Sequence, residues 1–424
     1  MSAVRVAIDM GSSSVKVATS AEAGAAPTFQ RIEHEPSMLD GVLQWQLDGL
    51  AHGVVARALA EHPDREVLVT VDGWGSDVAF LDARGRRIGP LRSYRDPSLA
   101  GAWAEVQRRG IPELVWQRTG SVITQDSTLT QLVDLQRRAP AWLSDVRTVL
   151  PIADYISSRL TGATRAGGSS LSTTAVLDPA TGRVDRELLD LVGIPEGWFA
   201  DPHVEGAEYG TEPMRGEPRV RVGKVAGHDT ASALLAGYRG GPFVSLGSWA
   251  VVGYVCGAGE RSDAPFRNQR GALHELSADG SLRLNRNVPG MRVLQRLARE
   301  WSRDPATVLP SISSRVSQPP LDVWTMDALP DGALSEWLAA RGSATFDEQV
   351  HVALVAVAGG VAAAIGEFGA SVPDGAAVWT CGGGSAVLPL RELIAAMTGR
   401  EIEAGPVEAS ALGGLDGLEA IDYR

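Results

Sequence analysis

The chain contains one short pattern twice: an apolar strand, a turn of glycine and serine, and a second apolar strand. The pattern occurs first over residues 4–18 and again over residues 243–255. Repetition of one supersecondary unit at distant points of a chain indicates two related lobes. We therefore predict an α/β protein of two lobes that face each other across a central cleft, each lobe supplying one turn.

The length of the chain supports the same division. A chain of 424 residues is too long for a single hydrophobic core. Gly240, Gly241 and Pro242 form a connection that favours neither helix nor strand. We place the domain boundary there, which gives an N-terminal lobe over residues 1–240 and a C-terminal lobe over residues 241–424.

Composition restricts the partners and the compartment. The formal net charge of −12 argues against a general nucleic-acid or anionic-membrane surface, and no uninterrupted apolar run approaches the roughly 18 residues of a membrane span. A strand pattern that begins at Val4 leaves no room for a signal peptide. The two cysteines, Cys256 and Cys381, have neither metal-binding nor redox spacing. Free thiols in a reducing cytosol are the simplest explanation, so we expect a cytoplasmic protein.

The first glycine-serine turn has the chemistry of a phosphate site. Residues 11–14 would expose backbone N–H groups in a concave nest, and the serine hydroxyls add donors. Asp9, at the end of the preceding strand, can hold a hydrated Mg²⁺ ion, and Lys16 can meet a phosphate. The turn at residues 247 and 248 repeats this chemistry. The alternative is an ordinary β-hairpin turn rich in glycine and serine.

A second group of residues has the chemistry of a sugar site. Trp74, Gly75 and Asp77 follow a predicted buried strand. An indole stacks on the apolar face of a polyol, and a carboxylate accepts hydrogen bonds from its hydroxyls. Tyr94 and Arg95 follow soon after, and the planar guanidinium of an arginine can grip hydroxyls. The alternative is a pair of surface turns, with Tyr94 a half-buried aromatic.

A carboxylate at the start of a small-residue helix completes the candidate site. An extended approach leads to Gly227, and His228, Asp229 and Thr230 then open a helix rich in alanine. A sharp turn at the glycine would present Asp229 at the mouth of the cleft. The alternative is that Asp229 only caps the helix. Phosphate and sugar sites elsewhere in the chain each need a central carboxylate, which favours the first interpretation.

Several further elements can be predicted. Residues 376–381 indicate a buried strand, and the glycines at 382–384 would let a flat ligand lie directly on the backbone. Asn287 and Gln295, two helical turns apart, form a polar pair that can face the cleft. Apolar spacing predicts helices over residues 40–62, 351–368 and 388–398.

Taken together, these motifs resemble those of the FGGY family of carbohydrate kinases, and within it most closely those of the rhamnulokinases. The resemblance extends from Asp9 to about Gly414. It is carried by Asp-Met-Gly-Ser-Ser-Ser, Val-Asp-Gly-Trp-Gly-Ser-Asp, Tyr-Arg-Asp, Ala-Gly-His-Asp-Thr-Ala-Ser-Ala, Ser-Leu-Gly-Ser-Trp, Asn-Val-Pro-Gly-Met-Arg-Val-Leu-Gln, Cys-Gly-Gly-Gly-Ser and Ala-Gly-Pro-Val-Glu-Ala-Ser-Ala-Leu-Gly. It implies an actin/hexokinase/Hsp70-like fold of two ribonuclease-H-like lobes. The N-terminal lobe would bind the sugar and carry the first phosphate loop, and the C-terminal lobe would bind the nucleotide.

The resemblance also implies roles for individual residues. Asp229 would be the general base. The first ATP phosphate loop would consist of Gly11, Ser12, Ser13, Ser14 and Lys16, and the second of Gly247 and Ser248. The nucleoside would lie against Gly383 and Gly384, with Gln295 also near the nucleotide, and the sugar would contact Gly75, His228, Asp229, Thr230 and Asn287.

The chain departs from the family pattern at some positions. Ser248 stands where the family usually has threonine, and Val15 and Lys16 replace a Gly-Arg pair. Residues 289–292 lack the usual Leu-Trp, and the second lobe is shorter than expected between residues 301 and 345. These departures affect the sugar assignment more than the kinase assignment.

The implied reaction is ATP- and Mg²⁺-dependent phosphorylation of a ketose, with L-rhamnulose converted to L-rhamnulose 1-phosphate as the first choice. L-Fuculose, xylulose or another ketose or polyol are alternatives for the substrate. A non-catalytic sugar- and ATP-binding protein, or an ATPase, on the same fold is the alternative for the function. The dimers of the family imply a homodimer, with neither a nucleic-acid nor a membrane partner.

Overall fold

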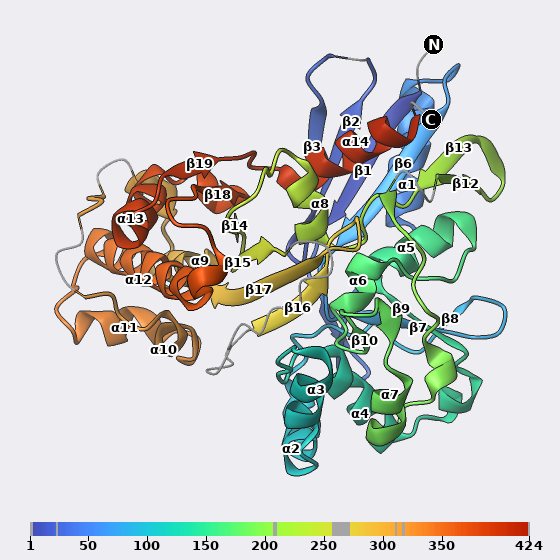
Figure 1. Ribbon diagram of the computed structural model, residues 1–424, viewed down its shortest axis with the longest axis horizontal. Coiled ribbons are helices and arrows are strands. Elements are labelled where there is room, and N and C mark those ends of the chain that lie inside the picture. Colours follow the sequence, from blue (N-terminus) through green and yellow to red (C-terminus); the bar gives the residue numbers. More distant parts are fainter. Residues whose placement is uncertain are drawn as a thin grey trace.

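Two six-stranded mixed sheets, one in each lobe, form the framework of the molecule (Figure 1). The computed structural model describes residues 3–22, 24–206, 210–256, 272–309, 312–315 and 319–422. In spatial order, the first sheet consists of β12 (Thr211–Met214), β13 (Glu217–Gly223), β6 (Val67–Gly73), β1 (Val4–Met10), β2 (Ser14–Ser20) and β3 (Thr28–Glu33). The second consists of β16 (Ala272–Leu276), β17 (Leu282–Pro289), β15 (Trp249–Val255), β14 (Phe243–Leu246), β18 (Val378–Cys381) and β19 (Ile402–Ala404).

Five strands of each sheet share one order and one set of directions. In the first sheet, β1 and β2 form an antiparallel hairpin, β6 and then β13 continue in parallel beside β1, and β3 lies antiparallel beside β2. The second sheet repeats these positions and directions. Strand β14 corresponds to β1, β15 to β2, β18 to β6, β19 to β13, and β17 to β3. The duplication that the two short hairpins predicted is therefore confirmed in the topology.

The helices flank these sheets, and each lobe has its own hydrophobic core. Those of the first part of the chain are α1 (Leu50–Glu61), α2 (Ala100–Arg108), α3 (Ile111–Thr119), α4 (Thr128–Arg138), α5 (Ile152–Thr161), α6 (Gly168–Ser172), α7 (Arg186–Val192) and α8 (Asp229–Leu235). Those of the second part are α9 (Arg292–Trp301), α10 (Val323–Asp327), α11 (Leu334–Ala339), α12 (Phe346–Glu367), α13 (Leu388–Thr398) and α14 (Ala409–Asp422).

Short elements complete the structure. The 3₁₀ helices are η1 (Pro97–Leu99), η2 (Ala141–Asp145), η3 (Glu196–Trp198), η5 (Pro305–Thr307), η7 (Gly369–Ser371) and η8 (Gly383–Ala386). Three small sheets pair β4 (Ser37–Leu39) with β5 (Val42–Gln44), β10 (Leu177–Asp178) with β11 (Arg183–Val184), and β7 (Val78–Leu81) with both β8 (Arg87–Ile88) and β9 (Thr148–Pro151).

Helix α14 follows the second sheet in sequence but packs on the first, against β1 and α8 (Figure 1). Glycines allow this close approach: a Cβ atom added at Gly413 would lie 1.8 Å from the carbonyl oxygen of Ser232 in α8, and one at Gly414 would lie 2.9 Å from the Cβ of Ala7 in β1. The end of the chain thus supports the helix that begins with Asp229. The domain boundary at residue 240 stays a prediction.

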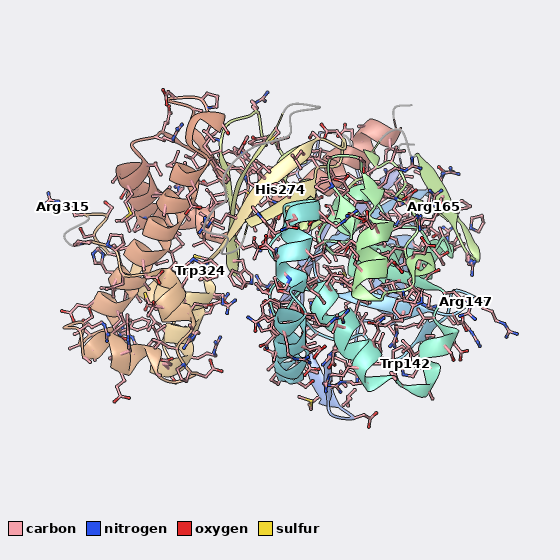
Figure 2. The ribbon with its side chains drawn as sticks, turned by 60° about the horizontal axis from the view of Figure 1, so that its bottom comes forward. Trp142, Arg147, Arg165, His274, Arg315 and Trp324 are labelled. Carbon is pink, nitrogen blue, oxygen red and sulfur yellow. The ribbon has the colours of Figure 1, made fainter. Side chains whose placement is uncertain are left out.

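Strand β16 belongs to the second sheet but touches the first lobe. The hydroxyl of Ser121, just beyond α3, donates to the carbonyl of His274 and accepts from its backbone N–H. The backbone N–H of Leu276 donates to the hydroxyl of Ser172 in α6, at 3.0 Å. Figure 2 shows His274 between the strand and the helices of the first lobe. Strand β16, at the edge of the second sheet, is therefore hydrogen-bonded to the first lobe as well as to its own sheet.

Helix α12 is long and apolar enough, by length and composition alone, to cross a membrane. Most of it lies inside the protein, however, because 61% of its most apolar stretch is buried. It begins with a capping box, in which the side chains of Thr345 and Glu348 each bind a backbone N–H of the other residue. It is the central helix of the second core rather than a separate apolar segment.

Most of the local predictions are confirmed, and two helices are wrong at their starts. The helix predicted over residues 351–368 begins earlier, at Phe346. Helix α13 and strand β18 lie where expected, and both cysteines are buried free thiols. The helix predicted over residues 40–62 begins only at Leu50, because residues 42–44 form β5 and pair with β4. Gly49, in the left-handed region with a φ of 83°, separates the two elements.

Candidate active site

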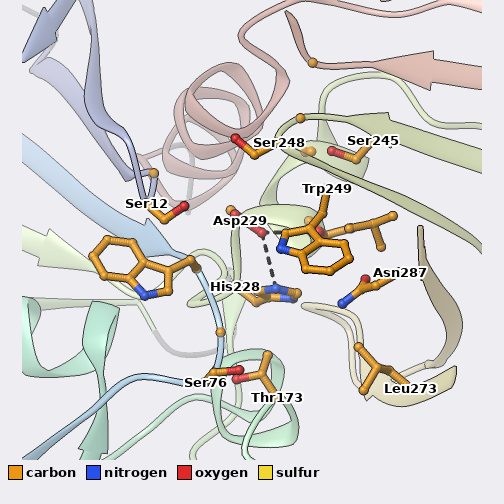
Figure 3. A pocket seen from close by; sticks show the side chains of 18 of the residues that line it. Ser12, Ser76, Thr173, His228, Asp229, Ser245, Ser248, Trp249, Leu273 and Asn287 are labelled. Atoms are coloured by element: carbon orange, nitrogen blue, oxygen red, sulfur yellow. Dashed lines mark hydrogen bonds and ion pairs between the residues drawn. The ribbon is translucent and has the colours of Figure 1, made fainter. Parts of the chain in front are cut away.

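One cleft of about 1600 Å³ runs between the two lobes. Its walls include Ser13 from the first glycine-serine turn and Ser248 from the second, with Asp229 in the same cleft. Figure 3 shows Ser12 at the left and Ser248 at the top of this space, with Asp229 in the centre and His228 beneath it. The two turns and the carboxylate that the sequence singled out are therefore brought together.

The first turn joins β1 to β2 and contains a backbone hydrogen bond of its own. The N–H of Gly11 donates to the carbonyl of Asp9 at 3.1 Å, and a Cβ atom at Gly11 would lie 2.7 Å from the carbonyl oxygen of Ser14. Lys16 follows in β2, and its Nζ lies 3.1 Å from Asp9 Oδ2 and 3.4 Å from Glu408 Oε2. The turn therefore has little room for a larger residue, and a single cation is shared by two carboxylates.

Two buried aspartates lie near Asp229: Asp9, which lines the cleft, and Asp72, which does not. Asp9 and Asp72 are partners in the parallel register of β1 and β6, and both are buried. Burial raises the pKa of Asp9, and the negative charge of Asp229 raises it further, while Lys16 opposes both effects. Burial also raises the pKa of Asp72 well above its usual value, with Asp9 and Asp229 adding to the effect. Lys16 therefore partly neutralises the negative charge of these carboxylates.

Tyr94 and Arg95 lie against the first turn. Arg95 Nη2 donates to the hydroxyl of Ser12 at 3.0 Å, and Arg95 Nε donates to the hydroxyl of Tyr94 at 3.1 Å. The guanidinium also lies over the ring of Trp45, 5.8 Å from its centre. Tyr94 lines the cleft, whereas Arg95 is not among its lining residues. The arginine thus contacts the phosphate side of the candidate site.

The second turn is fixed to the start of α9. The N–H of Gly247 donates to the carbonyl of Trp249, and the N–H of Met291 donates back to the carbonyl of Gly247, both at 3.0 Å. Gly384, in η8, lies close beside this turn, since a Cβ atom there would be 2.8 Å from the Cβ of Leu246. The turn, the glycine segment and α9 therefore form one wall of the cleft.

Asp229 is the first residue of α8, and its carboxylate does not cap that helix. The residue before the helix, His228, is extended and makes no side-chain capping bond. The preceding loop is held by buried groups: the N–H of Gly227 donates to Glu205 Oε1 at 2.7 Å, and both this N–H and that of His228 reach the hydroxyl of Ser169. The alternative of Asp229 as a simple capping residue is wrong.

The side chain of Asp229 has two neighbours of its own. The hydroxyl of Thr230 donates to Asp229 Oδ1 at 3.1 Å, and His228 Nε2 lies 3.2 Å from the same oxygen (Figure 3). Burial lowers the pKa of His228, although the nearby carboxylates of Glu275 and Asp229 oppose this effect. One oxygen of the carboxylate is thus engaged by its neighbours.

Of the residues predicted to form the sugar site near Trp74, some line the cleft and one lies behind them. Trp74 and Gly75 line the cleft, but Asp77 is buried behind them. Asp77 accepts hydrogen bonds from the indoles of Trp45 and Trp74, at 2.6 and 2.9 Å, and from Gln131 at 2.9 Å. Burial raises the pKa of Asp77 to about 6 against the lowering effect of these donors. Asp77 therefore orients the indole of Trp74 from behind.

Of the candidate residues, only Asp77 and Arg95 do not line the cleft. The others that the sequence singled out do line it: Asp9, Gly11, Ser12, Ser13, Ser14, Lys16, Trp74, Gly75, Tyr94, His228, Asp229, Thr230, Gly247, Ser248, Asn287, Gln295, Gly383 and Gly384. Their individual roles stay predictions.

Sequence analysis missed several neighbours of the site. Ser245 and Trp249 flank the second turn and line the cleft, and they could have been found from their place beside the glycine-serine pair. Glu275 lines the cleft from β16. The only sequence signal for this residue is the alternating pattern of a short edge strand. His34 Nε2 donates to the carbonyl of Gly11 at 2.8 Å, and no local pattern indicates that contact.

Comparison with known proteins identifies the family. Residues 4–235, more than half of the chain, match the N-terminal domain of the FGGY family of carbohydrate kinases. The chain belongs to the FGGY family of carbohydrate kinases. The resemblance read from the motifs is therefore confirmed, as is the class of carbohydrate kinase at the level of the family.

Relatives within the FGGY family include rhamnulokinases. The rhamnulokinase of Yersinia pestis (strain Pestoides F) is 31% identical over 331 residues, which cover 74% of this chain and 66% of that protein. The rhamnulokinase of Pectobacterium carotovorum subsp. carotovorum (strain PC1) is 30% identical over 441 residues, which cover 97% of this chain and 86% of that protein. The first alignment thus spans just under two thirds of the relative's length.

Solved structures show the same fold. A xylulose kinase from Brucella ovis matches 99% of this chain and 91% of its own, with a TM-score of 0.79 and 18% identity. A glycerol kinase from Plasmodium falciparum with ADP matches 98% and 88%, with a TM-score of 0.73 and 13% identity. These matches confirm the predicted α/β fold of two actin-like lobes, as in other FGGY kinases.

Proposed function

We propose that this protein transfers the γ-phosphoryl group of ATP to a hydroxyl of a ketose, and that L-rhamnulose, converted to L-rhamnulose 1-phosphate, is the first substrate to test. The proposal rests on one observation: Ser13, Ser248 and Asp229, from three separate segments, line a single cleft. Its volume, about 1600 Å³, exceeds the roughly 300–1,000 Å³ of most small-molecule sites, which leaves room for a nucleotide and a sugar. The rhamnulokinase names of the relatives support the choice of sugar.

The two turns would hold the phosphates. Phosphoryl transfer passes through a loose transition state, so the protein acts mainly by positioning and by stabilising charge on phosphoryl oxygens. The N–H groups of Gly11 and Gly247 bind within their own turns, so the backbone and hydroxyl groups of residues 12–14 and of Ser248 would supply the donors, one set from each turn. Gly383, Gly384 and Gln295 continue the cleft on the side of the second lobe, where the nucleoside would lie.

Asp229 would act on the acceptor hydroxyl. Its Oδ1 already accepts a hydrogen bond from Thr230 and faces His228, which leaves Oδ2 to accept the proton of the attacking hydroxyl. Proton transfer is late in a loose phosphoryl transfer, so an ordinary carboxylate is basic enough. Asp229 would therefore orient the hydroxyl first and take its proton last.

A divalent cation normally accompanies ATP, and the residues here fit one that keeps most of its water. Asp9 lines the cleft beside the first turn, with Oδ2 bound to Lys16. Mg²⁺ in nucleotide sites is bound by one or two carboxylates, by waters and by substrate phosphates. When bound, the cation would neutralise charge on the phosphate oxygens, with Asp9 as the carboxylate that holds it.

The sugar would lie between the lobes beside Trp74. Gly75 permits close contact there, since a Cβ atom at this position would lie 2.8 Å from the Cβ of Thr173. Asn287 lines the same region, and its Oδ1 is buried without a hydrogen-bond partner among the described residues. A sugar hydroxyl can satisfy that acceptor. The site thus offers one aromatic face and several polar groups to a polyol.

The test is a coupled ADP-release screen over ketoses and polyols, including L-rhamnulose, L-fuculose and xylulose. We expect one ketose to stimulate ADP release strongly. A protein that releases ADP equally with and without sugars would be an ATPase, and one that binds a sugar in calorimetry without turnover would be a non-catalytic binding protein. Either result would contradict the proposal.

The role of Asp229 is tested with the substrate that the screen identifies. Asp229→Asn should retain sugar and ATP binding but lose turnover by at least about a hundredfold, the usual contribution of a general base. Asp331→Asn is the matched control, because Asp331 is almost fully exposed and outside the cleft. Near-normal turnover of Asp229→Asn would exclude Asp229 as the base.

Two further expectations accompany this function. The family resemblance implies a homodimer, which sedimentation equilibrium would measure directly. The two free cysteines imply a cytoplasmic protein, which fractionation of the cells that make it would test. Detection of a monomer at micromolar concentrations, or of the protein in a membrane fraction, would contradict the respective expectation.

A further inference from the structure

A buried polar network connects the second lobe to the residue before Asp229. In the β16–β17 hairpin, Glu275 Oε2 accepts hydrogen bonds from Arg283 Nη2 and from Asn285 Nδ2, each at 2.6 Å. Arg283 Nη2 also lies 2.7 Å from His228 Nδ1, which belongs to the first lobe. The side chain of Arg283 is completely buried, and that of Glu275 is almost so. One guanidinium nitrogen therefore joins Glu275 to His228 across the two lobes.

The chemistry of arginine determines where His228 carries its proton. A guanidinium can only donate hydrogen bonds, so His228 Nδ1 must be the acceptor of the 2.7 Å contact. Burial lowers the pKa of His228, which favours the neutral ring. A neutral imidazole with an unprotonated Nδ1 carries its hydrogen on Nε2. Nε2 lies 3.2 Å from Asp229 Oδ1, so the protonated nitrogen is the one beside the carboxylate.

The consequence concerns the carboxylate itself. The hydroxyl of Thr230 donates to Oδ1 of Asp229, and Nε2 of His228 lies 3.2 Å from the same oxygen, so Oδ1 has a neighbour on two sides. The orientation of the carboxylate is then fixed, and Oδ2 is the oxygen left for a substrate hydroxyl. The other tautomer of His228 would present a lone pair to Asp229 and repel it.

We propose that Arg283 and Glu275 are positioning residues that hold His228 in its Nε2–H tautomer and thereby orient Asp229 toward the acceptor hydroxyl. The step from tautomer to turnover rests on the proposed function; the step from Arg283 to tautomer does not. Arg283 lies on the second sheet, whereas Asp229 lies in the first lobe. The orientation of the Asp229 carboxylate therefore also depends on how the β16–β17 hairpin packs against the first lobe.

Stability alone does not explain this ion pair. Arg283 Nε and Nη1 are buried without a hydrogen-bond partner among the described residues, so the guanidinium is incompletely satisfied. Buried ion pairs are often no more stable than apolar residues of similar size, and an unsatisfied one is less favourable still. What an apolar pair could not provide is a donor directed at His228 Nδ1.

The first experiment measures the tautomer directly, in protein labelled with ¹⁵N-histidine. Long-range ¹H–¹⁵N spectra distinguish a protonated from an unprotonated ring nitrogen, and comparison with His228→Gln assigns the signals. We expect Nε2–H with an unprotonated Nδ1 in the wild-type protein. A protonated Nδ1 in the neutral wild-type ring would overturn the proposal, whether or not the protein phosphorylates any sugar.

The second experiment removes the donor without leaving a buried charge. The double variant Arg283→Met/Glu275→Leu should lose the preference for Nε2–H, whereas Arg283→Lys, which can also only donate, should retain it. The double variant Arg5→Met/Glu419→Leu is the control, since it removes an ion pair of the first lobe outside the cleft. An unchanged tautomer in a folded Arg283→Met/Glu275→Leu variant would overturn the proposal. If that variant does not fold, the wild-type and Arg283→Lys spectra still decide between the two tautomers.

Kinetics then test the effect on the base. With the substrate identified by the screen, Arg283→Met/Glu275→Leu should lower kcat by about 10- to 100-fold, as expected when a reacting group is displaced by a fraction of an ångström. The KM for ATP should change little, and Arg283→Lys should recover most of the loss. A changed tautomer with normal kcat would overturn the positioning role. Absence of turnover in the wild-type protein would instead contradict the proposed function, with the spectra unaffected.

Discussion

The guanidinium of Arg95 donates a hydrogen bond from Nη2 to the hydroxyl of Ser12, 3.0 Å away and 83 positions earlier in the chain. Sequence reasoning placed Arg95 on the wall of the sugar site, and the structure places it against the first phosphate turn. Ser12 lines the cleft, whereas Arg95 lies behind it. The arginine therefore supports the turn through Ser12 and does not itself line the candidate site.

Removal of Arg95 should weaken nucleotide binding more than it weakens folding. Arg95→Ala deletes an exposed side chain, and exposed substitutions usually change the free energy of unfolding by less than about 0.5 kcal/mol. Loss of its bond to Ser12 should loosen the first turn and raise the KM for ATP several-fold. Arg84→Ala, an exposed arginine in the turn between β7 and β8, is the control. Equal KM values in the two variants would show that Arg95 does not support the turn.

Glu408 should weaken nucleotide binding by competing for Lys16. Its Oε2 lies 3.4 Å from Lys16 Nζ at the edge of the cleft. In Glu408→Gln the lysine loses this partner, and partly exposed ion pairs are worth up to about 1 kcal/mol, so ADP should bind up to about fivefold more tightly. Titration with a fluorescent ADP analogue measures this. The gain should shrink in high salt, because screening weakens such interactions; a gain that is independent of salt would contradict the electrostatic explanation.

Local patterns were sufficient for several elements whose neighbours in sequence are also neighbours in space, although the short β4–β5 hairpin was missed. The strands and turns at residues 4–18 and 243–255 could be predicted because each hairpin satisfies its own backbone hydrogen bonds. The same holds for α13, which has a proline in its first turn and ends at Gly399 in the left-handed conformation. The similarity of the two hairpins was also enough to predict that the two lobes share one topology.

Contacts between distant segments could not be predicted in this way. Asp77 has the local setting of a sugar ligand, yet Trp45 and Gln131, more than 30 and 50 positions away, surround it and make it a buried support. Arg283 and Glu275 are eight residues apart on an ordinary hairpin, and only the approach of the first lobe gives them a partner in His228. Such roles depend on the packing of the two lobes, which no periodicity encodes.

The contact between α14 and α8 should be sensitive to a single methyl group. Gly413→Ala would place a Cβ atom 1.8 Å from the carbonyl oxygen of Ser232, so α14 must shift away from the helix that carries Asp229. Overpacking of this kind destabilises proteins by about 1–3 kcal/mol, and kcat should fall as well. Chemical denaturation and steady-state kinetics measure the two effects.

Gly366→Ala is the matched control for that substitution. Gly366 lies near the end of α12, where an added Cβ atom would meet nothing within 4 Å. Alanine should stabilise the helix there by about 0.4–1 kcal/mol and leave kcat unchanged. If Gly413→Ala behaved like Gly366→Ala, the close packing of α14 on α8 would not support the site.

Glu205 should make part of the stability of the protein dependent on pH. Burial raises the pKa of Glu205 to about 7; the charge of Asp154 raises it further, and hydrogen bonds from Ser169 and Gly227 oppose the shift. In the unfolded chain a glutamate titrates near pH 4.3. Between these values the folded protein holds a proton that the unfolded chain has released. The contribution of Glu205 to stability is therefore complete below about pH 4 and is lost as the pH rises through 7, by up to about 3 kcal/mol.

Glu205→Gln removes this titration and isolates its effect. The free energy of unfolding of the variant, minus that of the wild-type protein, should rise between pH 4.5 and pH 8 by up to about 3 kcal/mol. Urea denaturation at several pH values measures the difference, with Glu336→Gln, an exposed residue of α11, as the control for which it should stay constant. A constant difference for Glu205→Gln as well would mean that Glu205 is ionised in the folded protein at pH 5, stabilised by the N–H groups of Ser169 and Gly227 that it accepts from.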